Sequence, residues 1–440
     1  MSDLGMSLPG APAALPWQLS DATTRRVRRR KRANVRFQIY GIGAIIIGLA
    51  ILAILLASVI GKGTGAFVQT RITLDVAFNE KIIDPDGARD PVKLGRADYA
   101  ALLKEAVAAS FPAVTARQDK RDLQKLFSGD ARYELRDMVV NDPSIIGTTR
   151  SVSLLAASDT DIFAKGSMAR DMAEGDRRLT DKQIAWINEL AAKNALETNF
   201  NWSFFTNADS RAPESAGIGG ALIGSFYTLL ITLAVCFPIG VMAAVYLEEF
   251  APKNRLTDLI EVNINNLAAV PSIIFGLLGL AIFIQAFHLP RSAPLVGGLT
   301  LALMILPTII VVTRAALKAV PPSIREAAYG VGASPIQVVT HHVLPLAVPG
   351  IATGTIIGMA RALGETAPLL MIGMVAFIVD FPGGPTDAAT VLPVQIFLWA
   401  DSPERGFEEK TAAGIMVLLA FLILMNAIAI YLRKRFEVRW

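Results

Sequence analysis

Residues 321–345 have the sequence PPSIREAAYGVGASPIQVVTHHVLP, a polar interruption between two long apolar segments. Ser323 and Glu326 have the spacing of a capping box, in which a hydroxyl and a carboxylate each satisfy a free amide at the start of a helix. The sequence therefore predicts a first short helix that begins near Ile324. Gly332 supplies the left-handed residue that ends this helix.

A second short helix follows directly. Ser334 and Gln337 form a second capping box, and Pro335 occupies the first helical position, where its missing N–H costs nothing. Because the residue before a proline disfavours the helical conformation, this second helix is expected to end before Pro345.

The first helix has a stripe of small apolar side chains. Ile324, Ala327, Ala328 and Val331 follow the spacing i, i+3, i+4 and i+7, which places them on one helix face. Small side chains allow the backbone of a partner to approach closely, so this face is expected to dock in a groove of another protein. A bulky side chain at Ala328 is then expected to block docking.

The same residues resemble the coupling-loop signature of bacterial ABC importer permeases. The signature appears here as Glu326-Ala327-Ala328, then Gly332, then Leu344-Pro345 at the family spacing. His342 departs from it, because the family usually has isoleucine there. An ordinary helical hairpin is the alternative interpretation. The resemblance implies that these six residues, within a coupling loop of residues 314–345, contact an ATPase subunit.

The composition is that of a polytopic membrane protein. Of 440 residues, 53% are hydrophobic and only 18% are charged. The net charge of +4 comes with basic residues near the ends of apolar runs, which gives no support to nucleic-acid binding. The single cysteine, Cys236, excludes an intramolecular disulfide.

The first apolar run indicates how the chain enters the membrane. Residues 1–36 form a tail that is predicted to be disordered at its start and contains the basic run RRVRRRKR at 25–32. Residues 37–60 follow without a charge, and about 20 apolar residues suffice to cross a bilayer. Basic residues favour the cytoplasmic side, so a cytoplasmic N-terminus and an uncleaved transmembrane helix are expected; a cleaved signal peptide is the alternative.

Residues 61–215 have the composition of a water-exposed domain, which positive-inside orientation places in the periplasm. Alternating apolar residues predict strands over 68–78 and 196–204, which are expected to pair, and a third strand over 151–157. Helices are predicted over 97–109, 122–127 and 180–195, the last with Thr180 and Gln183 as a capping box. The result is a small α+β domain without a metal or nucleophile motif, an accessory domain or partner surface rather than a catalytic one.

Residues 216–440 alternate apolar runs with short polar segments. Spans are predicted over about 218–246, 263–287 with an interruption at Pro271, 294–312 and 412–431, and the run over 346–380 is too long for one straight crossing. Gly220 and Gly224 have the spacing for close helix packing. A segment around 391–399 is a candidate for folding back into the membrane. With the first helix this gives about six transmembrane helices and a cytoplasmic C-terminus.

Arg361 and Glu365 are charges inside an apolar run. Each would cost about 2.5–3.5 kcal/mol at the centre of a membrane helix, so neither should face lipid. Arginine could attract an oxyanion in a translocation path, with glutamate setting its orientation. Alternatively the two residues, one helical turn apart, neutralise each other and hold neighbouring helices together.

Several segments are similar to the permeases of the phosphate-specific ABC importer. These segments are residues 265–280, 306–334 and ARALGETAPLL at 360–370, and the last is closer to the PstA-type subunit than to the PstC-type subunit. The resemblance covers about residues 216–440 and implies the all-α fold of a type I ABC importer permease. In that family the counterparts of Arg361 and Glu365 are associated with phosphate passage. Residues 61–215 depart from the usual permease.

The resemblance also implies partners. The chain contains no G-x-x-x-x-G-K-[ST] motif, so ATP and Mg²⁺ are expected on a separate PstB-type subunit, in two copies, and no cofactor or catalytic residue on this chain. A PstC-type permease and a periplasmic phosphate-binding protein are the other expected partners, in the bacterial cytoplasmic (inner) membrane.

Other functions stay open. The nearest alternative is import of another oxyanion such as sulfate or molybdate. A membrane-anchored phosphate-sensing or signalling scaffold and an ion-coupled secondary transporter are further alternatives, although the coupling loop and the lack of visible inverted repeats disfavour the latter. The three histidines, His288, His341 and His342, lie in no catalytic or metal-binding motif, which makes an enzyme the poorest interpretation.

Overall fold

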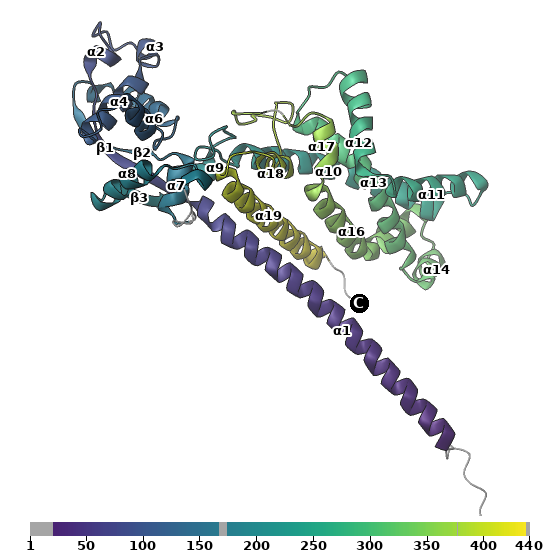
Figure 1. Cartoon of the computed structure of the whole chain (residues 1–440). Helices are drawn as coiled ribbons and strands as arrows, with labels where there is room; N and C mark the ends of the chain where they lie inside the picture. The colour runs from purple at the N-terminus through teal and green to yellow at the C-terminus, as the bar shows by residue number, and fades with distance from the viewer. Residues whose placement is uncertain (1–20, 167–173, 376, 437–440) are drawn as a thin grey trace, which may run out of the picture. The chain divides into compact units, whose positions relative to one another are not determined.

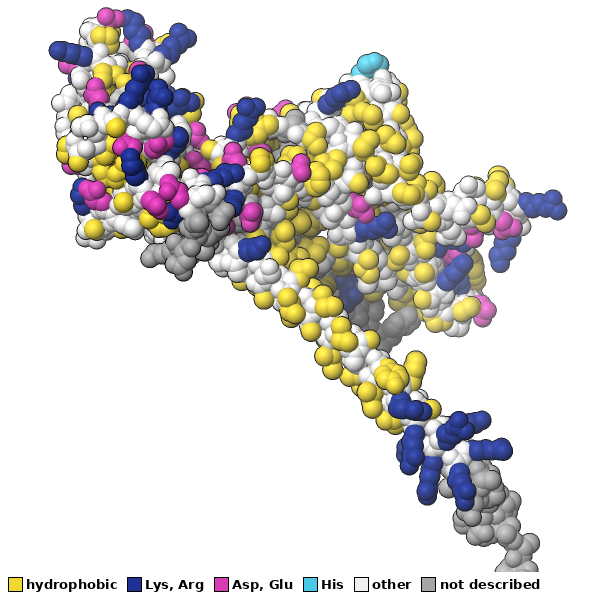
Figure 2. All heavy atoms as spheres, in the orientation of Figure 1, with side chains coloured by type: hydrophobic (Ala, Val, Ile, Leu, Met, Phe, Trp, Pro, Cys, Tyr) yellow, Lys and Arg dark blue, Asp and Glu magenta, His cyan; other side chains and the backbone are white. Residues whose placement is uncertain are grey.

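The computed structural model describes residues 21–166, 174–375 and 377–436. It divides into two compact units, residues 1–58 and residues 59–440. The first unit consists of most of α1 (Asp21–Gly63), a single long helix with apolar side chains exposed on all sides. Basic side chains gather at its N-terminal end, next to the apolar stretch (Figure 2). The helix predicted over 37–60 is therefore confirmed as part of a longer one.

The second unit begins with a three-stranded sheet. Its strands are β1 (Val68–Ala77), β2 (Thr149–Leu155) and β3 (Leu196–Phe200). Their order is β2-β1-β3, and both pairs are antiparallel, with Leu74 opposite Val152 and Val68 opposite Phe200. The predicted pairing of the first and last strands is confirmed.

The last strand differs from its prediction. β3 ends at Phe200, and Phe204 belongs to the short helix α9 (Ser203–Thr206). The strand itself is exposed on both faces except at Leu196, whereas Phe204 is fully buried. The alternating apolar residues over 196–204 therefore belong to a strand and to a short helix that follows it and buries Phe204.

Helices pack against this sheet and share one hydrophobic core with its strands. The larger ones are α4 (Tyr99–Ser110), α5 (Arg117–Gln124), α6 (Ala131–Asn141), α7 (Ser158–Ala164) and α8 (Asp181–Ala192). The short ones are α2 (Glu80–Ile83) and α3 (Pro91–Leu94). The capping box of Thr180 and Gln183 is present. The helix predicted over 122–127 lies earlier, because Phe127 leaves it to bridge Ala156 beside the sheet.

Helices of very different length, several of them long and apolar, follow the sheet domain. They are α10 (Gly219–Val245), α11 (Arg255–Ala268), α12 (Ser272–Gly279), α13 (Pro294–Lys318), α16 (Leu344–Gly364), α17 (Ala367–Met371), α18 (Leu392–Ala400) and α19 (Gly406–Phe436) (Figure 1). Among the described residues, five helices are long and apolar enough to cross a membrane, or six if one bent pair is counted as a span.

That bent pair covers the third predicted span and has its break at the predicted interruption. The helices over Arg255–Ala268 and Ser272–Ala286 meet at an angle of 102°. Pro271 lies at the break as the N-cap of α12, where its fixed φ and missing N–H end one helix and allow the next to start.

Close helix packing uses other glycines than predicted. Gly224 faces the backbone at Thr390 rather than another helix. Gly240 and Gly298 instead bring α10 and α13 together, because a Cβ at Gly240 would lie 2.7 Å from Cγ2 of Ile309 and one at Gly298 would lie 2.6 Å from Cβ of Ile231. The small residues at these two positions fix the spacing of the two helices.

Candidate functional site

The predicted helix-glycine-helix is present as α14 (Pro322–Gly330) and α15 (Pro335–Gln337). Gly332 between them has a φ of +86°, a conformation that side chains rarely adopt. The first capping box is wrong: α14 begins at Pro322, which puts Ser323 inside the helix, and no side chain caps it. The second box is confirmed, with the Ser334 amide donating to Oε1 of Gln337 over 2.9 Å.

Pro345 does not end the second helix, contrary to the prediction. The helix continues from Pro335 to Gly364 through a π-helical segment, η6 (Val338–Val343). In a π-turn each amide bonds five residues back, which displaces the carbonyl that a proline ring would otherwise strike. Pro345 therefore lies in the first turn of α16 and needs no donor there.

The apolar stripe of α14 is partly buried inside the chain and partly exposed at its surface. Ala328 is only 4% exposed and packs in a cluster with Leu317 and Val338. Glu326, Ala327 and Gly332 are exposed, and Leu344 and Pro345 are half-buried. The Ala328 side chain is buried and helps to attach α14 to the chain's own helices.

Large apolar side chains are exposed on this segment. They are Val331, the last member of the stripe, which is 84% exposed, and Tyr329 and Ile336, which the stripe did not include. Large apolar side chains exposed on a polar segment make it a candidate interaction site. Together with Glu326, Ala327 and Gly332 they form what we call the α14–α15 face.

A network of ion pairs attaches this segment to the neighbouring helices. Arg325 on α14 lies 2.6 Å from Glu249, which belongs to η4 (Tyr246–Phe250), the π-helical end of α10. Arg325 also donates to the carbonyls of Leu317 and Val320 at the end of α13. The hydrogen bond with Glu249 raises the pKa of Arg325. This arginine therefore joins three elements.

Arg314 on α13 forms a second junction. Its guanidinium lies 3.2 Å from Glu248 and 2.5 Å from Glu261 on α11, and Lys318 lies 3.5 Å from Glu248. All of these acidic residues are separated from their partners by more than 50 positions in sequence, so helical spacing gave no signal for them. The network fixes α14 relative to the ends of α10, α11 and α13.

Arg361 and Glu365 are together, as their spacing predicted. Nε of Arg361 lies 3.3 Å from Oε1 of Glu365 at the C-terminal end of α16, where the helix dipole also favours a cation. The Arg361 side chain is half exposed on this chain. Among the described residues, Glu365 is its only ionic partner. Its charge is therefore exposed at the surface of this chain.

The helical run is interrupted at this pair. The helix ends at Gly364, and α17 resumes the run and packs against α12. Gly276 of α12 permits this contact, because a Cβ there would lie 2.7 Å from Cα of Pro368. The break confirms that residues 346–380 do not form one straight crossing. It also fixes the end of α16 where Arg361 lies.

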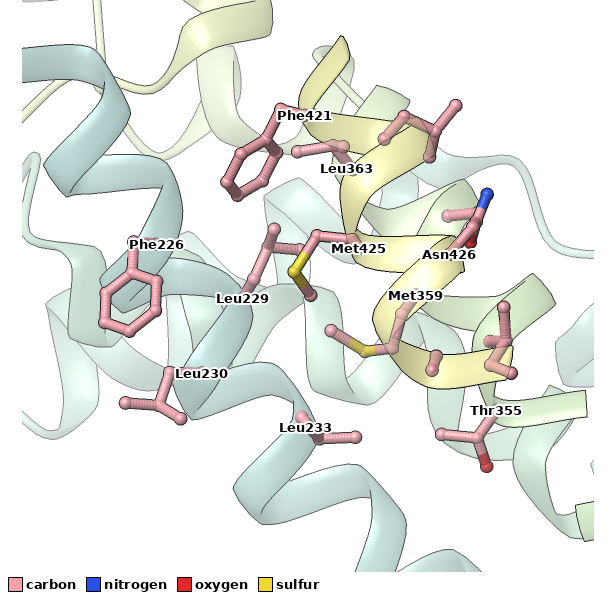
Figure 3. A pocket seen from close by; sticks show the side chains of 14 residues that line it. Phe226, Leu229, Leu230, Leu233, Thr355, Met359, Leu363, Phe421, Met425 and Asn426 are labelled. Carbon is pink, nitrogen blue, oxygen red and sulfur yellow. The ribbon is translucent and has the colours of Figure 1, made fainter. Parts of the chain in front are cut away.

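One groove of the helical region is apolar. It is a groove of about 170 Å³ between α10, α16 and α19, lined by side chains such as Phe226, Met359 and Phe421 (Figure 3). Thr355 and Asn426 are its polar members, and no charged residue lines it. An oxyanion would find no counter-charge there, so this groove suits an apolar helix or lipid chain rather than the transported ion.

Comparison with known proteins gives consistent results. Residues 236–438 match the family described as binding-protein-dependent transport system inner membrane component, and residues 24–174 match a domain of unknown function, DUF3333. The chain is 35% identical over 174 residues to the probable ABC transporter permease protein YqgI of Bacillus subtilis (strain 168). That match covers 39% of this chain and 58% of the relative, so the chain spans little more than half of YqgI.

A second relative is matched more fully. The chain is 33% identical over 218 residues to the phosphate transport system permease protein PstA of Pasteurella multocida (strain Pm70), covering 49% of this chain and 76% of the relative. Among solved structures, the inward-facing MetNI methionine ABC transporter matches 49% of this chain and 95% of its own, at 19% identity and a TM-score of 0.38, too weak a likeness for a structural argument. On the sequence relationships, the chain belongs to the PstA family of phosphate transport system permease proteins, multi-pass components of the inner membrane.

Proposed function

We propose that this chain is one membrane-spanning permease subunit of an ATP-driven importer of inorganic phosphate. Its relationship to PstA supports the substrate and the direction of transport. The structural observation that carries the coupling role is the α14–α15 face, an exposed apolar surface held in place by the pairs of Arg314 and Arg325. Such a surface, fixed to three helices, can pass a displacement into the membrane region.

The partners follow from what this chain lacks and what it presents. Its sequence has no phosphate-cradling P-loop motif, so ATP and Mg²⁺ would bind a PstB-type subunit, in two copies, that contacts the α14–α15 face. A PstC-type permease would complete the path, and a periplasmic phosphate-binding protein would deliver the ion. The basic residues at 25–32 and 433–435 support cytoplasmic termini.

Arg361 and Glu365 are the proposed substrate-path residues. The exposed guanidinium could bind an oxyanion. Once the ion has passed, the glutamate 3.3 Å away could pair with the guanidinium again. Closure of the ATPase subunits would move the α14–α15 face. The continuous helix from Pro335 to Gly364 would carry that movement to Arg361.

The direct test is uptake of labelled phosphate into proteoliposomes that contain this chain with its cognate partner subunits and binding protein. ATP is enclosed or omitted, and sulfate and molybdate are added outside as competitors. Uptake that requires ATP and resists both competitors is expected. Displacement by sulfate or molybdate would reassign the substrate, and uptake without ATP would contradict the ATPase coupling.

A further inference from the structure

The domain built on β1–β3 carries a pocket that transport does not use. It has a volume of about 290 Å³ and lies between the turn before α4 and one side of α6. Three arginines line it, Arg96, Arg132 and Arg136, together with Tyr133 and Asp98. This size is close to the lower end of small-ligand pockets, which have volumes of about 300–1,000 Å³.

An aromatic ring holds two of the arginines in place. The Arg132 guanidinium lies 4.7 Å from the centre of the Tyr133 ring and donates to its hydroxyl over 2.9 Å. The Arg136 guanidinium lies 5.2 Å from the same centre and is paired with Asp137. Cation–π contacts restrain the guanidinium groups without neutralising their charge.

The local charge balance favours an anion. Within the part of the chain that the structure describes, Arg96 and Arg132 have no carboxylate partner. The one acidic residue of the lining, Asp98, already accepts from the amide of Ala101 as the N-cap of α4. The lining therefore has three positive charges and one negative charge, and two of the guanidinium forks are available.

The backbone beneath the pocket is rigid. Tyr99, at the pocket floor, is 4% exposed and donates its hydroxyl to the carbonyl of Leu94 over 2.7 Å. Leu94, Leu102 and Leu135 are fully buried behind it and connect α3, α4 and α6. Arg132 and Arg136 are thus mounted on a helix above a packed core, and Arg96 lies in the short turn between α3 and α4; the rigid mounting on α6 reduces the ordering cost of binding.

We infer that this pocket binds a phosphate group, carried either by orthophosphate or by a phosphomonoester. Guanidinium forks match the paired oxygens of a phosphate, and charge-assisted hydrogen bonds of this kind are stronger than neutral ones. The space around the arginines also exceeds what a bare phosphate fills, which leaves room for the remainder of a small ester. The inference stands on the pocket alone and does not depend on the transport function.

Site-resolved arginine labelling tests this inference on the full chain. The purified chain is treated with phenylglyoxal, and the modification of each arginine is followed by peptide mass spectrometry. Orthophosphate or glycerol 3-phosphate is added, with sodium chloride at the same ionic strength as reference. Protection of Arg96 and Arg132 is expected, whereas exposed Arg117, on α5 of the same domain, should be labelled at an unchanged rate.

The two anions identify the source of the phosphate group. Stronger protection by the ester would assign a phosphomonoester, and equal protection would assign orthophosphate. No protection relative to chloride, or equal protection of Arg117, would overturn the inference. Because the readout is local to each arginine, neither result depends on whether phosphate is transported.

Variants give an independent measurement. Arg132→Gln should weaken binding of the protecting anion by about tenfold, the loss of one charge-assisted hydrogen bond. Arg132→Lys, which keeps the charge but not the fork, should lose less, and Arg117→Gln should bind as the parent does. The melting temperature of each variant reports whether the domain is folded. Unchanged binding in folded Arg132→Gln would contradict the site.

Discussion

At the scale of single residues, Ala328 of α14 and Val331, the C-cap of that helix, have opposite roles. Ala328 is buried against α13 and the π-helical segment, whereas Val331 is exposed. Val331→Asp should therefore strongly reduce ATP-dependent uptake without changing the melting temperature. Ala328→Trp should instead destabilise the chain by about 1–3 kcal/mol, the usual cost of overpacking. Normal uptake by Val331→Asp would show that the α14–α15 face does not contact the ATPase.

The pair of Arg361 and Glu365 can be tested by a double-mutant cycle. If Arg361 binds the transported ion, Arg361→Gln should abolish uptake, and adding Glu365→Gln should not restore it. If the two charges only neutralise each other, the double variant, which has neither charge, should recover uptake. Uptake rates, with membrane levels of each variant measured in parallel, separate the two roles.

Asp209 provides a test of pH dependence outside the spans. Burial raises its pKa above the ordinary value of 3.8, although hydrogen bonds from Trp399 and from the Ser210 amide oppose the rise. The folded state therefore holds this proton more tightly than the unfolded state does. The stability contributed by Asp209 is full below about pH 3.8 and is lost as the pH rises through the folded pKa.

Asp209→Asn keeps an oxygen for Trp399 but carries no charge. Its melting temperature should exceed that of the parent at neutral pH, and the difference should shrink as the pH falls toward 4. Exposed Asp401→Asn, at the end of α18, serves as the control and should leave the melting curve unchanged. A constant difference across the pH range would contradict the buried-carboxylate account.

At the scale of elements, the π-helical segment determines whether one continuous helix connects the coupling segment to Arg361. Because the helix does not stop at Pro345, residues Pro335–Gly364 form one helix of 30 residues. At 1.5 Å per residue, about 25 Å of helix separates Leu344 from Arg361. The coupling segment and the proposed path residue thus belong to the same continuous element.

The ion pair of Arg325 and Glu249 is expected to keep α14 in register with α10. Either Arg325→Glu or Glu249→Arg alone places like charges together and should lower both stability and uptake. A hydrogen-bonded charge of this kind contributes about 1.5–3 kcal/mol. The double exchange should recover most of the loss in melting temperature. Recovery of stability without recovery of uptake would show that the arginine's bonds to the α13 carbonyls, rather than the ion pair, position α14.

At the scale of the whole second unit, the sheet domain and the last helix share a buried polar cluster. Lys165 of α7 lies 2.5 Å from Asp161 and 3.7 Å from Glu409 of α19, and it donates to the Gly65 carbonyl. Lys410, 5% exposed, donates to the Ala216 carbonyl. Deleting residues 70–212 would remove Asp161 and Lys165 from this cluster, so such a deletion would perturb α19 as well as remove the domain.

Lys165→Met should therefore be strongly destabilising, by about 3–5 kcal/mol, because two partly buried carboxylates lose their shared partner. Lys193→Met provides a matched control, since Lys193 also pairs with an acid four residues earlier but is largely exposed. Exposed pairs contribute about 0–1 kcal/mol. Equal melting temperatures for the two variants would contradict a structural role for the buried cluster.

The sequence alone determined the features that depend on local chemistry. Alternating side chains in β1, the capping boxes of Thr180 and Ser334, the left-handed Gly332 and the long apolar runs were all predicted, because each is set by residues within about one or two turns. The association of Arg361 with Glu365 also followed from spacing along one helix. The coupling-loop motif indicated the family for the same reason: its residues are contiguous.

Only the tertiary structure determined the contacts between residues that lie far apart in the sequence. The direction of Ala328 inward and Val331 outward depends on which neighbours pack against α14, and helical periodicity places both on one stripe. The acidic partners of Arg314 and Arg325, and the contact of Lys165 with Glu409, come from other elements that periodicity does not identify. The continuation through Pro345 required a widened turn. In each case burial and charge pairing between distant segments outweighed the local preference.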